Sequence, residues 1–135
     1  MAMERLGDPN EVIERWDRVF RALASEPRRQ LLTSLNDLPA GCDVALPEGA
    51  MSPRAPMDPE SLRTELYHSH LPLLADGGYV AWDDEPLTAR RGPNFREVAV
   101  VFDALYETAN RIPDQLVLGC QRLENERDRD ANGST

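Results

Sequence analysis

The stretch that most constrains the fold runs from residue 58 to residue 91 and indicates a helix followed at once by a β-hairpin. Asp58 is a suitable N-cap, and Pro59 suits the first helical position, where its missing N–H costs no hydrogen bond. Gly77 and Gly78 supply the left-handed conformation that ends many helices. After them we expect a strand over 79–82, an acidic turn over 83–86 and a return strand over 87–91.

The predicted helix has two chemically different faces. Leucines recur near one face and predict that it is buried, although Pro72 inside the pattern should kink the helix or start a new turn. The opposite face carries side chains that can hydrogen-bond to a partner. A helix of this kind beside a hairpin is the second half of a winged helix-turn-helix, in which it enters the major groove of DNA. The apolar positions are Leu62, Leu66, Leu73 and Leu74, and the polar positions are Ser61, Arg63, Thr64, Tyr67 and His68.

Two helices precede this stretch. Asp8 caps a helix over 9–24, whose apolar stripe we expect to be core, or shared between the core and a dimer contact. Ser25 caps a second helix over 26–36. Arg28 and Arg29 in its first turn fit solvated or acid-paired side chains better than phosphate ligands. The stripe of the first helix consists of Val12, Trp16, Val19, Phe20 and Leu23.

The segment from 38 to 57 is rich in proline and glycine, which forbid a long helix. A helix-turn-helix places its positioning helix here, so we expect that helix to be eroded or replaced by a loop. Residues 44–46 favour a short strand or a single helical turn. The loop could instead serve a protein partner.

The C-terminal third predicts a long helix that begins after Asn94, followed by a further helix from Pro113. Its apolar residues alternate in steps of three and four, which is the repeat of a helix that pairs with another helix. We expect 1–93 to be the winged helix-turn-helix domain, 94–126 the dimerisation helices and 127–135 a disordered acidic tail. One helix packed on its own core is the alternative. The predicted dimer residues are Phe95, Val98, Phe102, Leu105, Ala109, Ile112 and Leu116.

The charge composition is unusual, with 24 acidic against 15 basic residues, all of them arginine, and a net charge of −9. This balance is typical of a protein from a salt-loaded cytoplasm. At about 1 M salt the Debye length falls to ~3 Å, so repulsion between the protein and DNA hardly acts beyond contact. No apolar run approaches the length of a membrane span, and the N-terminal residues lack a signal-peptide core, so we expect a cytoplasmic protein without membrane contact.

Two segments resemble a known family. HLPLLADGGYVAW (70–82) and VFRALASEPRRQLLTSL (19–35) are similar to the recognition helix with its first wing strand, and to the first two helices, of ArsR-type winged-helix regulators. LYHSHLPLLADGGYV (66–80) is more similar still to small haloarchaeal winged-helix domains of unknown function. The resemblance covers residues 12 to 105. It implies a mainly α, α+β fold with a two-stranded wing, and a protein that dimerises through its terminal helices.

Other chemistry has little support in the sequence. Cys42 and Cys120 are far apart, and His68 and His70 point to nearly opposite sides of a helix, so we expect no metal site. Phosphate loops, nucleophile elbows and H-E-x-x-H are missing, and we expect neither an enzyme nor a cofactor.

The sequence therefore predicts a homodimeric, sequence-specific DNA-binding transcriptional regulator of a halophilic archaeon. The polar helix face would contact bases and phosphates of double-stranded DNA, and Arg90 and Arg91 would hold the backbone beside the wing. The wing tip is acidic, whereas a tip that enters a minor groove carries arginine or lysine. This favours the alternative, a winged-helix protein–protein interaction module that does not bind DNA.

Overall fold

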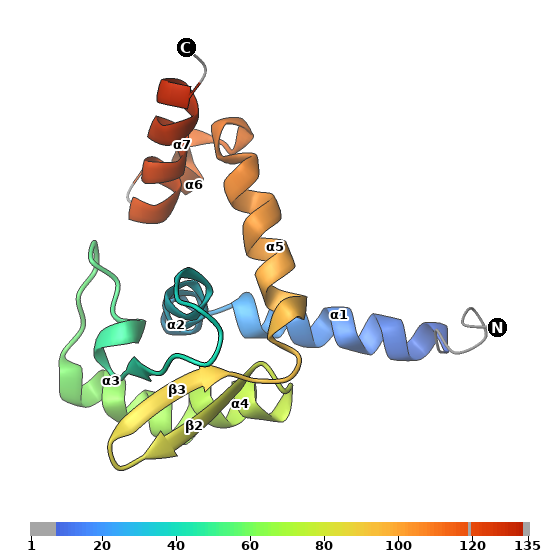
Figure 1. Cartoon of the computed structure of the whole chain (residues 1–135), viewed down its shortest axis with the longest axis vertical. Helices are drawn as coiled ribbons and strands as arrows, with labels where there is room; N and C mark the ends of the chain where they lie inside the picture. The colour runs from blue at the N-terminus through green and yellow to red at the C-terminus, as the bar shows by residue number, and fades with distance from the viewer. Residues whose placement is uncertain (1–7, 119, 134–135) are drawn as a thin grey trace.

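The computed structural model describes residues 8–118 and 120–133 and shows a mainly helical α+β architecture with one small antiparallel sheet (Figure 1). None of the described helices is long and apolar enough to cross a membrane. The helices are α1 (Pro9–Leu23), α2 (Glu26–Asp37), η2 (Glu48–Ala50), α3 (Pro59–Glu65), η3 (Leu66–His70), α4 (Leu71–Asp76), α5 (Phe95–Glu107), η4 (Ala109–Arg111), α6 (Asp114–Val117) and α7 (Gln121–Gly133). The strands are β1 (Val44–Ala45), β2 (Val80–Asp84) and β3 (Leu87–Arg91).

The predicted helix after Asp58 is confirmed as a continuous run of α3, η3 and α4, which we call the reader helix. The Asp58 carboxylate accepts a hydrogen bond from the Ser61 backbone N–H at 3.0 Å, so the predicted cap is formed. Pro72 does not break the run. The turn before it widens into the π-helical segment η3, and the Leu71 N–H donates to the Leu66 carbonyl. Gly78 then adopts the left-handed conformation, with φ +77°.

The β2–β3 hairpin follows the reader helix as predicted, and β1 adds a third strand beside β3. Within the hairpin, Trp82 lies opposite Ala89, and Ala89 also faces Val44 of β1. The proline-rich segment 38–57 thus contributes a strand, and its only helical element is the three-residue turn η2. The expectation that no full positioning helix forms in this segment is confirmed.

Four of the seven predicted dimer residues lie in the chain's own core, which corrects their assignment to a dimer contact. α5 packs against α1 and α2, and its buried residues share one core with these helices. The long C-terminal helix is also shorter than expected, because α5 ends at Glu107. Phe95, Val98, Phe102 and Ala109 are buried, Ile112 is half-buried, and Leu105 and Leu116 are exposed.

The predicted disordered tail is wrong for residues 127–133, because α7 continues to Gly133. Arg127 holds this helix by donating to the Asp114 carboxylate at 2.6 Å and to the Ala109 and Ile112 carbonyls. Residues 134–135 of the predicted tail, like 1–7 of the predicted first domain, lie outside the described residues.

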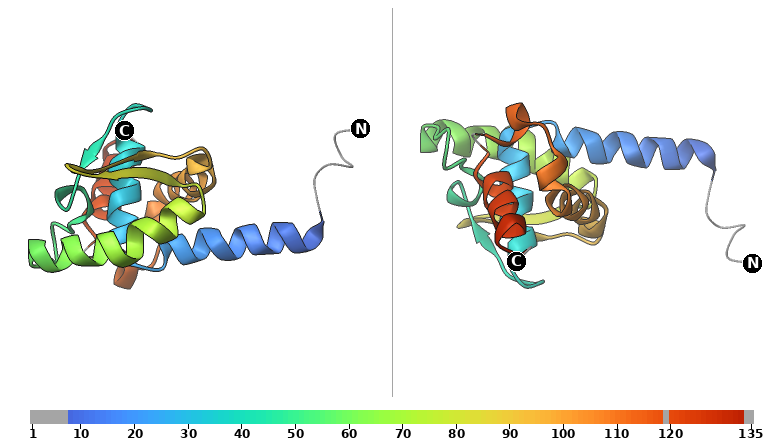
Figure 2. Two further views of the ribbon diagram at one scale, coloured as in Figure 1. Left: turned by 90° about the horizontal axis from the view of Figure 1, so that it is seen from below. Right: turned by 90° about the horizontal axis from the view of Figure 1, so that it is seen from above.

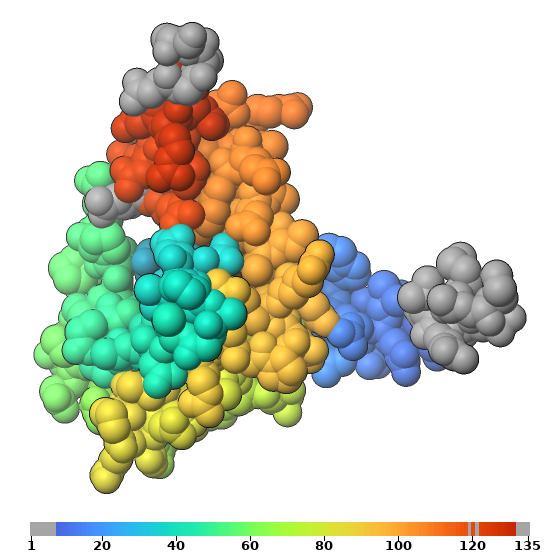
Figure 3. All heavy atoms as spheres, viewed as in Figure 1, coloured from blue at the N-terminus to red at the C-terminus, as the bar shows by residue number. Residues whose placement is uncertain are grey.

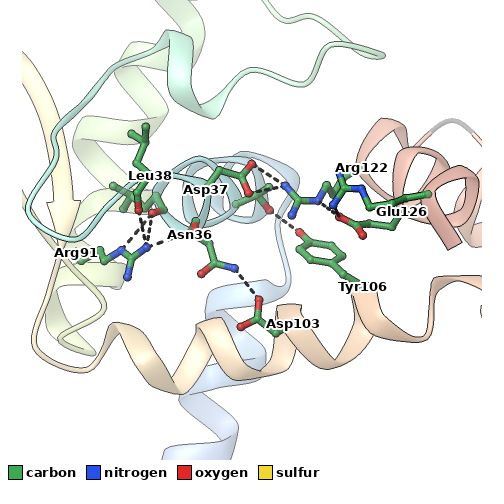
Figure 4. A network of polar contacts seen from close by, with 11 residues as sticks. Asn36, Asp37, Leu38, Arg91, Asp103, Tyr106, Arg122 and Glu126 are labelled. Atoms are coloured by element: carbon green, nitrogen blue, oxygen red, sulfur yellow. Dashed lines mark hydrogen bonds and ion pairs between the residues drawn. The ribbon is translucent and has the colours of Figure 1, made fainter. Parts of the chain in front are cut away.

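The far end of α2 joins the hairpin, α5 and α7 in one polar network (Figure 4). Arg122 of α7 donates to both Asp37 carboxylate oxygens at 2.6 Å and stacks over the Tyr106 ring at 4.4 Å. Asn36 donates to Asp103 of α5 at 3.0 Å. These contacts tie the C-terminal helices to the rest of the chain.

The N-terminal half of α1 extends away from the rest of the molecule in all views (Figure 2). Val19 and Ala22 near its C-terminal end are buried, whereas Val12, Trp16 and Phe20 are 44%, 50% and 58% exposed. The predicted stripe therefore divides into a core half and an uncovered half. In the space-filling view α1 forms an arm beside the body (Figure 3).

Candidate nucleic-acid interface

All five polar residues predicted to read DNA are exposed on the reader helix. Two of the hydroxyls are already donors within the helix. The Ser61 hydroxyl donates to the Asp58 carboxylate at 3.1 Å, and the Thr64 hydroxyl donates to the Glu60 carbonyl at 3.1 Å. Both oxygens remain able to accept a hydrogen bond from a ligand.

The reader helix is fixed to the hairpin through Tyr67. Its ring meets the Trp82 ring edge-on, with centroids 5.5 Å apart, and the His68 ring at 5.2 Å. Trp82 is half-buried and was not among the predicted site residues. The sequence of a strand does not indicate which side chain its tryptophan will contact. The aromatic contact sets the orientation of the helix relative to the hairpin.

Arg63, Tyr67 and His68 are the members of this face that are available to a ligand. Within the described residues, no hydrogen bond or ion pair engages their side chains. Together with Thr64 they line a shallow, open depression whose other wall is Asp84, Glu85 and Leu87 of the hairpin. The depression thus places one permanent cation opposite two carboxylates.

The two hairpin arginines have different positions. Arg90 forms an exposed ion pair with Asp83 at 3.1 Å, across the hairpin. Arg91 instead donates to the Leu35 carbonyl from Nε at 3.2 Å and to the Leu38 carbonyl from Nη2 at 2.7 Å. These groups lie at the C-terminal end of α2, where helix carbonyls lack partners.

Arg91 therefore does not fit the predicted role of a phosphate ligand. Its guanidinium also lies over the Phe95 ring, 4.8 Å from the centroid, so it is committed to the scaffold on two sides. Arg90 keeps an exposed guanidinium that phosphate could take from Asp83.

Of the two arginines of the second helix, Arg28 differs from expectation, because it is 8% exposed and donates to the Arg21 and Ala22 carbonyls at 2.7 and 3.1 Å. Arg29 is exposed, as predicted, and donates to the Leu23 carbonyl at 2.6 Å. Both arginines donate hydrogen bonds to the last carbonyls of α1. Two adjacent arginines in the sequence do not predict such a contact.

His70 lies on the buried side of the reader helix and is 7% exposed. Its Nδ1 is 2.9 Å from Nη1 of Arg28, and its Nε2 is 3.3 Å from the Glu65 carboxylate. Burial lowers the pKa of His70 below its ordinary value, the hydrogen bond to Glu65 opposes this, and the charge of Arg28 adds to the lowering.

No group of three histidine, cysteine, aspartate or glutamate side chains in the described part of the chain is placed to hold a metal ion. Cys42 and Cys120 are both unpaired thiols.

The uncovered side of α1 is an exposed apolar surface. We call Val12, Ile13, Trp16 and Phe20 the α1 ridge; all four are exposed, and the Trp16 and Phe20 rings stack with centroids 5.7 Å apart. A mainly apolar groove runs along its base to Val100 of α5. The ion pair between Arg15 and Glu97 borders the groove.

Comparisons with models of known protein families, with curated proteins and with solved structures find no match to this chain.

Proposed function

We propose that this chain is a winged-helix, DNA-binding transcriptional regulator that acts as a homodimer in a salt-loaded archaeal cytoplasm. The observation that carries the proposal is the reader helix. It is capped at Asp58 and anchored by buried leucines on one side. On the other side it presents Arg63, Tyr67 and His68 without intramolecular polar partners in the described chain, next to a hairpin in the position of a wing.

The reader helix would lie in the major groove, where base edges offer both donors and acceptors. Arg63 would donate to guanine or to phosphate, which is the contact that guanidinium geometry favours. The Ser61 and Thr64 oxygens would accept from base amino groups, since their protons are used within the helix. Arg90 would contact the backbone beside the hairpin after giving up Asp83.

The acidic hairpin limits the conditions in which this binding is favourable. Asp84 and Glu85 lie in the same depression as Arg63, so in dilute buffer they would repel the phosphate backbone. At about 1 M salt, with a Debye length of ~3 Å, only groups in direct contact with DNA would still feel that charge. Hydrogen bonds and shape would then carry the affinity, because the gain from counterion release has faded.

The α1 ridge is the proposed contact between two copies. It replaces the predicted α5 stripe in that role, because most residues of that stripe are buried within one chain. Exposed aromatic residues on an extended helix fit the apolar centre of a homodimer interface. Two copies would present two reader helices to a two-fold-related site.

The proposal is tested by recovering cross-linked DNA from salt-adapted cells that express the protein. The Arg63→Ala/Tyr67→Ala double variant removes the free guanidinium and the exposed ring one turn later on the same face, and we expect discrete DNA peaks to disappear. Arg111→Ala is the matched control, because it deletes an exposed arginine of η4 outside the reader helix. Circular dichroism would establish that each variant is folded. Unchanged peaks in the double variant would remove the reader assignment.

A protein-interaction module is the second candidate, and the acidic hairpin is the observation that favours it. Asp83, Asp84 and Glu85 are exposed at its tip, where a wing that enters a minor groove needs cations. If the parent protein enriches no DNA over the double variant, the same cross-linked material should be analysed for proteins bound at the hairpin.

A further inference from the structure

A chain of three side chains connects the reader helix to the junction of α1 and α2. Glu65 lies 3.3 Å from Nε2 of His70, whose Nδ1 lies 2.9 Å from Nη1 of Arg28. The same guanidinium donates to the Arg21 and Ala22 carbonyls at the end of α1. One buried arginine thus holds α1 and the reader helix together.

The proton positions in this chain follow from the donors available. Arg28 can only donate, so Nδ1 of His70 must be the acceptor and carries no proton. The single proton of the neutral ring therefore sits on Nε2, which faces the Glu65 carboxylate. The contact between Arg28 and His70 requires a neutral imidazole.

A second proton on His70 would destroy this arrangement. It would have to sit on Nδ1, where it would face an N–H of Arg28 at hydrogen-bond distance and place two cations side by side in a buried site. The charged side chains that act on the ring are Arg28 of α2 and Glu65 of α3, while α1 contributes only backbone carbonyls through Arg28. Burial and Arg28 outweigh Glu65, so the pKa of His70 is lowered.

The position of His70 in the reader helix lets its contact with Arg28 affect the exposed face of that helix. It is the last residue of η3, and Pro72 two residues later has no N–H to donate, so this turn has fewer backbone hydrogen bonds than an α-helix. Tyr67 and His68, which face outward, belong to the same turn. Side-chain contacts beneath the turn therefore help to set the geometry of the exposed face.

We propose that Glu65, His70 and Arg28 form an acid-sensitive latch, in which protonation of His70 frees the reader helix from the α1–α2 junction. Acidification would loosen the turn that carries Tyr67 and His68. The consequence for DNA rests on the proposed function, but the latch exists in the free protein and is tested there.

The first test is a proton NMR titration of the histidine ring in molar KCl. His68 and His70 are the only two histidines, so the His68→Asn variant leaves one resonance to follow and needs no change in the latch. We expect His70 to titrate below the ordinary histidine value of about 6.5. Titration of His70 at or above that value would overturn the latch.

The second test measures amide hydrogen exchange of the reader helix between about pH 7 and pH 5, corrected for intrinsic exchange rates. When only the open state binds a proton, the equilibrium constant for opening of the helix rises up to about tenfold for each pH unit below 6.5. His70→Asn places a non-titrating amide oxygen near the position of Nδ1, and we expect it to remove the pH response. His68→Asn is the matched control and should keep it. An equal response in parent and His70→Asn would overturn the proposal, whether or not the protein binds DNA.

Discussion

Replacing Arg91 by methionine should destabilise the fold far more than the same change at its neighbour Arg90. Arg91 donates to the Leu35 and Leu38 carbonyls at the end of α2, and Leu35 is fully buried. Losing hydrogen bonds from a charged donor costs about 1.5–3 kcal/mol. The cation at a helix C-terminus adds about 0.3–1 kcal/mol, and the stacking on Phe95 adds about 0.5–1 kcal/mol.

These contributions overlap, so we expect Arg91→Met to lower the free energy of unfolding by about 2–4 kcal/mol. For a chain of this size that corresponds to a decrease in Tm on the order of 10 °C. Arg90 has one exposed ion pair with Asp83, so Arg90→Met should cost about 0–1 kcal/mol.

Urea denaturation in molar KCl, followed by circular dichroism, measures both variants under the same conditions. Equal midpoints for the two variants, or a larger loss for Arg90→Met, would refute the assignment of Arg91 to the scaffold. That result would return Arg91 to the set of residues free to contact phosphate.

Two further predictions concern the apolar residues that sequence and structure place differently. Phe102→Ala should cost about 3–5 kcal/mol because Phe102 lies on the buried side of α5. Leu105→Glu, on the exposed side of the same helix, should change the free energy of unfolding by only about 0.5 kcal/mol. Thermal denaturation of both variants measures this, and an unchanged Tm for Phe102→Ala would contradict the burial. Trp16→Glu/Phe20→Glu should convert a dimer into folded monomers in light scattering at molar KCl. Leu118→Glu is the control, because it changes an exposed apolar residue outside both proposed dimer surfaces. A dimer that persists in the double variant would place the interface away from the α1 ridge.

The helix and hairpin of residues 58–91 were predictable because their signals are local. The cap at Asp58 and the left-handed Gly78 act within a few residues of themselves, and the structure forms the helix and the hairpin beside them. The turn differs, because β2 continues to Asp84, two residues into the predicted acidic turn. The exposure of the polar face follows from the burial of the leucines opposite.

The partner of a buried face could not be predicted in the same way. The repeat in α5 indicates that Phe102 and its neighbours are covered, but helix pairing within a chain and between chains requires the same spacing. The stripe of α1 presents the opposite case, since its first half finds no cover in the chain. Only the tertiary structure distinguishes the two helices.

The arginines show a second limit. Arg28, Arg91 and Arg127 all donate to backbone carbonyls at or near the ends of other helical segments. When the free carbonyls of a helix end accept hydrogen bonds from a side chain far away in the sequence, neither the residues near the helix end nor those near the side chain predict the contact. The predicted tail formed a helix for the same reason, because its charged residues find partners in α6 and η4 that composition does not reveal.

The same arginine chemistry links the two surfaces on which the proposed function depends. The α1 ridge belongs to a helix whose end is closed by Arg28, and Arg28 also contacts His70 on the buried side of the reader helix. A second copy seated on α1 would restrain that helix, and through Arg28 it would restrain the turn that carries Tyr67 and His68. Because linkage is reciprocal, a dimer that stabilises the contact between Arg28 and His70 should lose affinity when protonation of His70 breaks that contact.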